Sequence, residues 1–426
     1  MADFRPFRGI RYNSAVAGPL DSLICPPYDV ISLAQERDLL GRSPHNMVRL
    51  ELAETHDTPA PERYSNATGH YQQWLEEKVL LQDEDPGYYL LRQQFIFQGA
   101  TLERYSLLGA LKLEHFGSGV LPHENTAEGP KQDRLALMEA CQANFSPIMG
   151  LIRDDAKTVA SVRNRTMAKM PEAEFAGDDG QQYALWRIVE PDQILAINQA
   201  VASQPVYIAD GHHRYETAIT YRDQAGNDAA AYIMMSLTSF DDPGLLLLPY
   251  HRVLKELPPP LFVQIRDRIQ QVFFTQPASL DAGSPEAIER LVAQEGIDHP
   301  AMALVGPGGE GPFLLTVGNP DLVDRYVPQD AIPSLREIDA WILEAVILRP
   351  IMGDDLSTYV EYLHDGQAVL QMMAERKAHM ALFLRAVPMD VFQQVVGAGV
   401  RLPRKSTYFF PKLPSGVVIN SLADSI

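Results

Sequence analysis

The sequence predicts a mixed α/β fold built around a sheet that contains both parallel and antiparallel neighbours. Short apolar runs of the kind found in buried strands alternate along the chain with segments whose apolar residues recur at helical spacing. Expected hairpins interrupt this alternation, which favours a mixed sheet over a purely parallel one. The triple proline at 258–260 is the clearest internal boundary, so we expect a core lobe over residues 1–257 and a C-terminal lobe over 258–426 packed on it.

The first half of the chain is expected to contain helices and strands in alternation. The spacing of Ala67, Tyr71 and Trp74 places them on one face of a helix, and the polar–apolar alternation of residues 46–51 predicts a strand. In chain order we expect a helix over residues 32–40, a strand over 46–51, a helix around 67–75, a hairpin with strands over 88–97 and 105–113, a helix from 135 and a strand over 146–152.

The second half continues the same alternation. Ser284 is a suitable N-cap for a helix, and Pro285 suits its first turn. In chain order we expect a strand over residues 206–209, a helix from 215, strands over 229–237 and 245–253, helices from 261 and 284, strands over 301–305 and 313–317, a helix over 335–349, a strand over 358–363 and a helix over 366–374.

The overall charge argues against a nucleic acid or membrane partner. Lys and Arg number 36 against 55 Asp and Glu, a net charge of −19, whereas a nonspecific grip on nucleic acid or anionic lipid needs a basic surface. No run approaches the roughly 20 apolar residues of a membrane span, and the N-terminus lacks the apolar core of a signal peptide. The two cysteines, Cys25 and Cys141, cannot form a disulfide framework, so we expect a cytoplasmic protein.

The segment Asp210-Gly211-His212-His213-Arg214 lies where a predicted strand meets a predicted helix. Such a junction exposes backbone N–H groups and the positive end of a helix dipole, which suits a phosphate or a carboxylate. Gly211 lets the backbone approach an anion without a Cβ in the way, and Arg214 adds a fork of donors. In the alternative interpretation, the histidines cap the helix and Arg214 pairs with Asp210.

A second polar stretch precedes this junction. It contains His123, Glu124, Lys131, Asp133 and Arg134, spread over a Pro-His-Glu-Asn-Thr loop and the start of a predicted helix. Side chains of both signs at such a place usually form a solvated surface network, but a loop outside regular structure is also where a catalytic carboxylate is found. We expect the loop His123–Thr126 and the segment Lys131–Arg134 to face the junction at 210–214.

Several motifs resemble a known family. Asp-Gly-His-His-Arg at 210–214 resembles the motif of the ParB/sulfiredoxin-like superfamily, in which free-serine kinases carry a similar Asp-Gly-His-x-Arg run. Four further runs resemble the uncharacterised family 1015 of the domains of unknown function (DUF1015) and keep its order: Pro26-Pro27-Tyr28-Asp29-Val30-Ile31, Pro122-His123-Glu124-Asn125-Thr126, Leu248-Pro249-Tyr250-His251-Arg252 and Lys405-Ser406-Thr407-Tyr408-Phe409. The resemblance implies a ParB/sulfiredoxin-like nucleotide-binding core, with Glu124 in the place of the base of the serine kinases.

The residue types disfavour thiol redox chemistry and a structural zinc site. Sulfiredoxins place a reactive Cys inside a Gly-Cys-His-Arg motif, where this sequence has His212. His212 and His213 are adjacent, so their side chains diverge, and no other His or Cys pair has ligand spacing. A magnesium ion carried in by a nucleotide needs one or two carboxylates, for which Glu124, Asp133 and Asp210 are candidates.

Phosphoryl transfer fits these residue types best, because it needs positioned phosphates, cations over the transferring charge and a base near the acceptor. We expect a nucleotide-binding protein that acts as a kinase on a small hydroxylated metabolite, such as a hydroxy amino acid, with ATP or ADP and Mg²⁺. The expected catalytic residues are Glu124 and Asp210, and the expected nucleotide or phosphate ligands are Gly211, His212, His213, Arg214, Thr217, His123, Lys131 and Arg134. The alternatives are a nucleotide-binding or NTP-hydrolysing regulatory protein without a metabolite acceptor, and a scaffold without catalysis.

Overall fold

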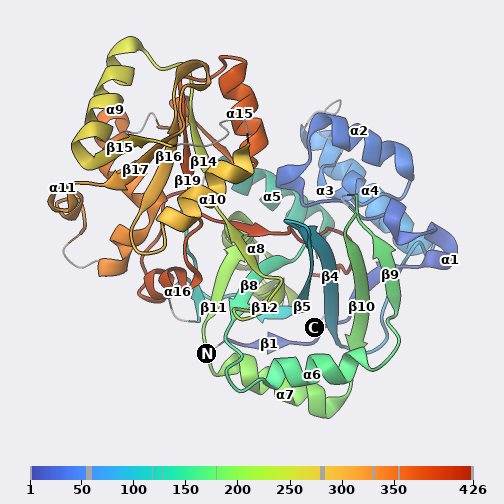
Figure 1. Ribbon diagram of the computed structural model, residues 1–426. Helices are drawn as coiled ribbons and strands as arrows, with labels where there is room; N and C mark the ends of the chain where they lie inside the picture. Colours follow the sequence, from blue (N-terminus) through green and yellow to red (C-terminus); the bar gives the residue numbers. More distant parts are fainter. Residues whose placement is uncertain are drawn as a thin grey trace. The chain divides into compact units, whose positions relative to one another are not determined.

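The computed structural model describes residues 2–53, 60–117, 119–126, 128–178, 180–278, 284–328, 332–353 and 356–423. The chain divides into two compact units (Figure 1). The first comprises Met1–Pro122, Thr126–Leu246 and Pro411–Ile426, and the second comprises His123–Asn125 and Leu247–Phe410. The long segment of the second unit runs from Leu247 to Phe410. Neither end of this segment coincides with the lobe boundary predicted after residue 257.

Two backbone contacts explain these unexpected crossings of the chain. In the second unit, the N–H of Leu402 donates to the carbonyl oxygen of His123 at 2.7 Å, which ties residues 123–125 to that unit. In the first unit, the N–H of Ile419 donates to the carbonyl oxygen of Ile10 at 2.8 Å, which ties the C-terminal segment there. Both contacts join residues hundreds of positions apart, so no local pattern predicts them.

Within the described residues of the first unit, nine strands form one mixed sheet. Its order is β6-β11-β8-β12-β5-β4-β10-β9, with β1 paired to β5. β11 is parallel to β6 and β12 is parallel to β8, while the other neighbours are antiparallel, which confirms the predicted mixed α/β class. The strands are β1 (Phe4–Arg5), β4 (Tyr88–Phe97), β5 (Ala100–Lys112), β6 (Val120–Leu121), β8 (Ile148–Ile152), β9 (Ala173–Ala176), β10 (Gln182–Ile188), β11 (Val206–Asp210) and β12 (Tyr232–Ser239).

Helices and two short strand pairs complete the first unit. The helices are α1 (Ser14–Ala17), α2 (Leu33–Arg42), α3 (Val48–Glu51), α4 (Ala60–Glu76), α5 (Glu128–Cys141), α6 (Thr158–Met167), α7 (Pro191–Ala202) and α8 (His212–Ala225), with 3₁₀ turns at Leu20–Ser22, Tyr28–Val30 and Ala229–Ala231. The strand pairs are β2 (Ile10–Tyr12) with β3 (Leu80–Gln82), and β7 (Ala143–Asn144) with β21 (Asn420–Ser421).

One face of the large sheet is apolar and packs against helices. Leu90 of β4, Leu107 of β5 and Leu237 of β12 belong to one buried cluster. Val162 of α6 and Ile197 of α7 belong to the same cluster, and these two helices lie side by side (Figure 1). Burying such side chains provides most of the free energy that holds helix to sheet.

The opposite face of the sheet carries buried polar side chains. Alternate residues of a strand point to opposite sides, so side chains of the other parity point away from the leucine cluster. They include Gln93 of β4, Arg104 and Ser106 of β5, and Ser236 and Thr238 of β12, each no more than 2% exposed. Burying polar groups is costly unless they are hydrogen-bonded. This face is therefore a candidate binding site for a polar ligand.

The second unit contains an antiparallel sheet of six strands within the described residues. Its order is β15 (Phe273–Pro277), β17 (Phe313–Val317), β16 (Ala301–Val305), β19 (Met380–Leu384), β14 (His251–Leu254) and β18 (Val360–Leu363). β13 (Leu246–Leu248) pairs with β20 (Tyr408–Phe410). The helices are α9 (Pro259–Val272), α10 (Pro285–Glu295), α11 (Pro320–Asp324), α12 (Asp339–Trp341), a π-helical stretch Ile342–Leu348, α13 (Arg349–Met352), α14 (Leu356–Tyr359), α15 (Gly366–Ala374) and α16 (Met389–Gly397), with 3₁₀ turns at Pro307–Gly309 and Pro333–Glu337.

Several predicted elements differ from the structure in type or extent, and two of the predicted strands show why. Residues 46–51 were predicted as a strand but contain α3, because the Asn46 side chain accepts from the Val48 N–H at 3.0 Å and so starts a helical turn. The alternation there is misleading, since Met47 and Glu51 are buried as fully as Val48. The strand predicted over 245–253 is two strands, β13 and β14, with Pro249 between them.

Candidate functional site

The junction predicted at residues 210–214 joins β11 to α8. β11 ends at Asp210, Gly211 has φ 95° and ψ 28°, and α8 begins at His212, which is buried, while His213 is half-buried. This left-handed conformation suits glycine, and a Cβ on Gly211 would lie 3.0 Å from Arg214 Nη2. The first turn of α8 carries no acidic side chain. No carboxylate of that turn therefore competes with an anion for the positive end of the helix dipole.

Asp210 is held between two cations. Arg214 Nη2 donates to Asp210 Oδ2 at 2.9 Å, which is the ion pair that the sequence left open as an alternative. Lys412 Nζ contacts the other carboxylate oxygen of Asp210. Lys412 belongs to the C-terminal segment of the first unit, and its carbonyl oxygen accepts from Gln93 Nε2 at 2.9 Å. The C-terminal segment thus connects the junction to the polar face of the sheet.

A series of polar contacts leads from Arg214 to Arg134. Arg214 Nη1 donates to Ser146 Oγ at 2.9 Å and to the carbonyl oxygen of Pro147 at 2.8 Å. Ser146 Oγ donates to Glu51 Oε1 at 3.0 Å, and Arg134 Nη1 donates to the carbonyl oxygen of Glu51 at 2.8 Å. The side chains of Arg134 and Glu51 also form an ion pair with N···O 3.9 Å. The two predicted arginines are therefore joined through Ser146 and Glu51.

Tyr28 and Asp133 complete the surroundings of Arg134. The Arg134 Cζ lies 4.2 Å from the centroid of the Tyr28 ring, and its Nη2 lies 2.5 Å from Asp133 Oδ2. Burial opposes the charge of Arg134, but the carboxylates beside it raise its pKa above the usual value. Burial raises the pKa of Tyr28 to about 12, with Arg214 and Arg134 acting against the shift. Tyr28, which belongs to the Pro-Pro-Tyr-Asp run that resembles DUF1015, thus contacts Arg134 and lies in the electrostatic field of Arg214.

Arg104 is a fully buried cation on the polar face of the large sheet. Its Nη2 donates to Gln93 Oε1 at 2.5 Å, and its Nη1 lies 3.9 Å from Met149 Sδ. Burial lowers the pKa of Arg104 to about 10, and nearby negative groups, Asp210 among them, act against this shift. Among the described residues, no carboxylate lies within ion-pair distance of Arg104, yet Asp242 and Asp210 both act on its charge electrostatically.

The start of α5 lies against α8. Thr126 Oγ1 donates to Glu216 Oε2 at 2.6 Å, and Lys131 Nζ forms an ion pair with the same oxygen at 3.2 Å. Thr217 Oγ1 donates to the carbonyl oxygen of Lys131 at 3.4 Å. The segment Lys131–Arg134 is thus brought to the helix that begins at the junction. The ammonium group of Lys131 is paired with Glu216 and with no group of the junction segment 210–214 among the contacts described here.

The family of this chain is evident from its sequence as a whole. A family model described as "Protein of unknown function (DUF1015)" matches residues 4–340. The chain belongs to this family. No curated protein sequence matches this DUF1015 chain.

Several solved structures resemble the DUF1015 chain weakly. A free serine kinase in complex with AMP shares 12% identity, with 68% of this chain and 84% of that chain covered and a TM-score of 0.37. A conserved hypothetical protein from Pyrococcus furiosus shares 13%, with 72% and 94% covered and a TM-score of 0.38. SbnI with a C-terminal truncation, from Staphylococcus aureus, shares 9%, with 74% and 88% covered and a TM-score of 0.40. Likeness at this level assigns neither substrate nor activity to the chain.

The second unit of the DUF1015 chain holds two of the predicted site residues. His123 is 2% exposed; its Nε2 lies 2.8 Å from Thr407 Oγ1, and its ring contacts Phe392 edge-on. Glu124 Oε2 accepts from the backbone N–H of Lys405 at 3.1 Å. The predicted base is therefore oriented by backbone of its own unit, and its role in catalysis stays a prediction.

Three segments that resemble DUF1015 motifs meet in this second unit. Besides the contact of Glu124 with Lys405, Arg252 Nη1 donates to the carbonyl oxygen of Lys405 at 2.9 Å. Lys405 Nζ lies 5.1 Å from the centroid of the Tyr250 ring, and Tyr250 packs against Tyr408 at 5.4 Å between centroids. The Pro-His-Glu, Pro-Tyr-His-Arg and Lys-Ser-Thr-Tyr-Phe segments are thus one structural cluster, although they are far apart in the sequence.

Sequence reasoning missed Lys412, Glu51, Ser146 and Arg104 as members of the site. Lys412 follows closely after the Lys-Ser-Thr-Tyr-Phe run, and this basic and aromatic tail was the available signal. For Arg104, the available signal was a charged residue within a predicted hairpin whose other residues are largely apolar. Glu51 was hidden by the wrong strand prediction for its segment.

Neither a metal cluster nor a membrane-spanning helix is present in the part of the chain that the structure describes. In those residues, no group of three or more His, Cys, Asp or Glu side chains is arranged to hold a metal ion. No helix there combines the length and the apolar character needed to cross a membrane.

Proposed function

We propose that the first unit binds a nucleotide through its phosphates at the polar cluster around Asp210, Arg214, Lys412 and Arg104, and that the protein transfers phosphate between this nucleotide and a small hydroxylated metabolite. One observation carries the proposal. A surplus of buried and half-buried positive charge surrounds atoms that have no hydrogen-bond partner among the described residues, beside the N-terminus of α8.

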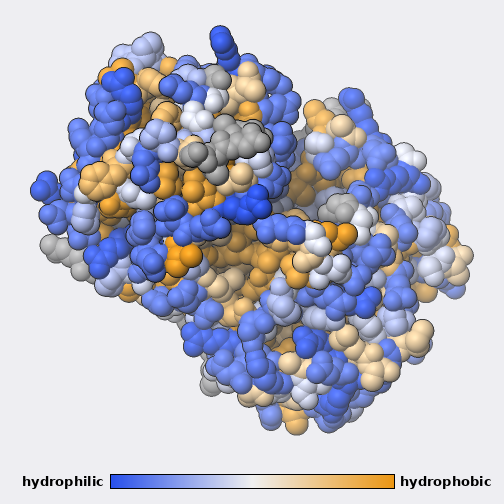
Figure 2. Space-filling model, in the orientation of Figure 1, coloured by the Kyte–Doolittle hydropathy of each residue, from blue (hydrophilic) through white to orange (hydrophobic). Residues whose placement is uncertain are grey.

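The charge of the cluster is opposite to that of the chain. Five cations belong to it, against four carboxylates: Arg63, Arg104, Arg134, Arg214 and Lys412 against Glu51, Asp133, Asp210 and Asp242. The chain as a whole has a net charge of −19, and hydrophilic side chains make up most of the face shown in Figure 2. A positive excess that is buried or half-buried is costly unless an anion compensates it, which supports a phosphate ligand.

Three buried polar atoms add a second argument. Nine buried side-chain atoms in the described residues have no hydrogen-bond partner, and Arg104 Nε, Arg214 Nε and Ser236 Oγ are the three considered for the phosphate. Leaving such an atom unsatisfied costs about 1–3 kcal/mol, and native proteins do so rarely. Two of the three belong to guanidinium groups, whose donors suit phosphate oxygens. A bound phosphate would supply the missing acceptors.

The same groups would serve in phosphoryl transfer. Its transition state carries negative charge that fixed cations stabilise, which is the part we assign to Arg214, Lys412 and Arg104. Asp210 would hold Lys412 and Arg214 in position through its two oxygens. His212, His213 and Thr217 come from the same helix, so we keep them as phosphate ligands, with Lys131 and Arg134 supporting from α5.

The base and the metal are finer parts of the proposal. We assign the base to Glu124, because phosphoryl acceptors need a carboxylate or imidazole to take the hydroxyl proton. Mg²⁺ would enter with the nucleotide, which usually supplies most of its ligands. Asp210 is a poor ligand for it while both of its oxygens contact cations.

The test compares nucleotide affinity of Lys412→Met with that of the unaltered protein by isothermal titration with ATP, ADP, AMP and inorganic phosphate. Losing one charge-assisted hydrogen bond to phosphate should weaken binding about 10- to 100-fold. Lys169→Met is the matched control, because Lys169 pairs with Glu190 on the surface. Equal affinities in a folded Lys412→Met protein would contradict the proposal. If nucleotides bind but no acceptor in a panel of hydroxy amino acids and sugars is phosphorylated, the protein is a nucleotide-binding regulator instead.

A further inference from the structure

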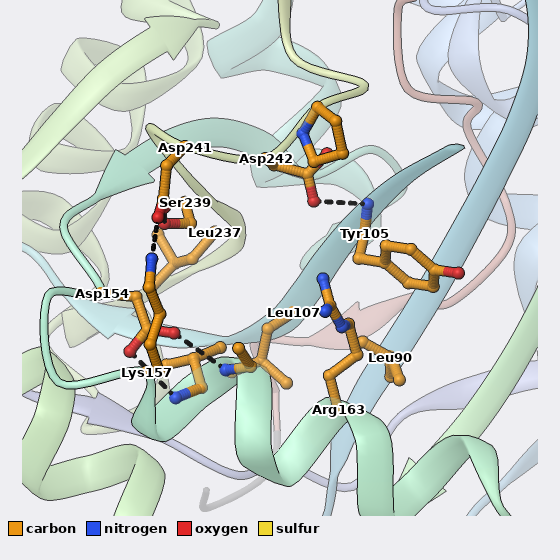
Figure 3. A pocket seen from close by; sticks show the side chains of 13 residues that line it. Leu90, Tyr105, Leu107, Asp154, Lys157, Arg163, Leu237, Ser239, Asp241 and Asp242 are labelled. Atoms are coloured by element: carbon orange, nitrogen blue, oxygen red, sulfur yellow. Dashed lines mark hydrogen bonds and ion pairs between the residues drawn. The ribbon is translucent and has the colours of Figure 1, made fainter. Parts of the chain in front are cut away.

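We propose that the first unit contains a second, independent binding site, on the apolar side of the large sheet, for a small monocarboxylate with an apolar body. The site is a pocket of about 260 Å³ between the sheet and α6 (Figure 3). Its apolar floor lies on the opposite face of the sheet from Arg104, and none of the residues assigned above to the phosphates lines it.

The floor of the pocket is apolar. Leu90, Leu107 and Leu237 come from three adjacent strands, and Val159 and Ala160 from α6 form one wall. An engineered cavity of about 150 Å³ accepts benzene, so this pocket has room for a ligand of roughly ten non-hydrogen atoms. A ligand of this size would gain most of its affinity by burying an apolar body there.

Most charges at the rim are already used within the protein. Asp154 accepts from the N–H groups of Val159 and Ala160 at 3.0 and 2.8 Å, which caps the first turn of α6. Lys157 Nζ is paired with Asp241, which lies across the pocket from α6 (Figure 3). These groups shape the opening, but they have little capacity left for a ligand.

Arg163 is the exception. Its guanidinium lies over the ring of Tyr105, 4.7 Å from the centroid, and Figure 3 shows the side chain rising from α6 between Tyr105 and Leu107. Its Nε contacts Asn164 Oδ1 at 3.3 Å, whereas its two terminal nitrogens have no hydrogen-bond partner in the described part of the chain. A guanidinium held flat on an aromatic ring with its terminal fork unused is suited to bidentate recognition of a carboxylate.

The balance of charge selects a singly charged ligand. Three carboxylates line the pocket, those of Asp154, Asp241 and Asp242, against the two cations Lys157 and Arg163. Asp242 is 8% exposed, and its oxygens accept from the N–H groups of Tyr105 and Gly244 at 3.2 and 2.9 Å. Because the carboxylates outnumber the cations, a phosphate dianion would meet more repulsion there than a carboxylate, while an amine could not use the donors of the Arg163 fork. A monocarboxylate therefore fits best.

The test is isothermal titration with three carboxylates of increasing size, namely 3-methylbutanoate, 3-phenylpropionate and octanoate. We expect saturable binding of at least one of them. The corresponding alcohol, amine and phosphate monoester should each bind at least about tenfold more weakly, because only the carboxylate satisfies the Arg163 fork without a second negative charge.

Substitutions of residues that line the pocket test whether the carboxylate binds there. Arg163→Met should weaken the best carboxylate about tenfold or more, and Ala160→Leu, which fills the wall without changing charge, should abolish its binding. Arg165→Met is the matched control on the same helix, since Arg165 is exposed and pairs with Asp192, and it should bind like the unaltered protein. The proposal is overturned if none of the three carboxylates binds, if the amine or the phosphate ester binds as tightly, or if Ala160→Leu retains the affinity.

Discussion

Replacing Arg104 by Met should stabilise the unliganded protein and weaken its response to nucleotide. Arg104 is fully buried, and burial lowers its pKa from 12.5 to about 10. At 1.36 kcal/mol per pKa unit, holding this charge in the folded state costs about 3 kcal/mol at neutral pH. Met removes the charge at similar volume, beside the apolar Met149. Gln93 Oε1 loses its donor, at a cost of about 1 kcal/mol, so the net gain is about 2 kcal/mol.

Differential scanning calorimetry with and without ATP measures both effects. The Tm of Arg104→Met without ligand should rise by a few degrees. ATP at about 100 times its Kd should stabilise the unaltered protein by about 2.7 kcal/mol, and this increment should largely disappear in the variant. The variant would then be the more stable protein without ATP and the less responsive one with it, as expected of a residue kept for binding rather than for stability.

Arg252→Met is the matched control. Arg252 is also fully buried and burial lowers its pKa, but its Nη1 donates to the carbonyl oxygens of Tyr250 and Lys405 at 2.7 and 2.9 Å, and its Cζ lies 4.7 Å from the Tyr362 centroid. Removing these contacts should destabilise the protein by about 2–3 kcal/mol. If Arg104→Met is destabilised like Arg252→Met and keeps its response to ATP, then Arg104 is structural and the reasoning fails.

Three further predictions test other groups. Glu124→Gln should keep nucleotide affinity within a few-fold but lower the proposed phosphoryl-transfer turnover by roughly 10²–10⁴; steady-state rates equal to those of the unaltered protein would remove Glu124 as base. Burial raises the pKa of Asp339 to about 7 despite Arg385, so its stabilising contribution is complete below about pH 4 and is lost as pH rises through 7. Relative to Asp339→Asn, the unaltered protein should therefore lose about 4 kcal/mol of unfolding free energy between pH 4 and 8. Urea denaturation at several pH values measures this free energy, and the same pH dependence for both proteins would refute the prediction. Burial raises the pKa of both buried thiols, that of Cys141 to about 11, so a thiol reagent at pH 8 should modify Cys25 and Cys141 only after denaturation; rapid labelling of the native protein would show otherwise.

Local elements were predictable where periodicity and neighbours agree. The strands at 301–305 and 313–317 have the predicted bounds, and the hairpin around Gln98 is present as β4 and β5. The cap of α10 is also as predicted, since Ser284 Oγ accepts from the Ala287 N–H at 3.3 Å. The prediction for residues 46–51 failed because polar and apolar residues alike are buried there, Asn46 and Glu51 as well as Val48 and Leu50, so the alternation does not indicate which face is exposed.

By itself, the sequence determined which residues meet at the junction between β11 and α8. The strand, Gly211, the histidines and Arg214 lie within a few positions of one another, where backbone hydrogen bonds and helical spacing act, and the pairing of Arg214 with Asp210 is of this local kind. Only the tertiary structure decided which distant side chains join them. Lys412 reaches Asp210 across 202 positions, because the C-terminal segment returns to the first unit. Such contacts depend on which surfaces bury each other over the whole chain, and no short window of sequence contains that information.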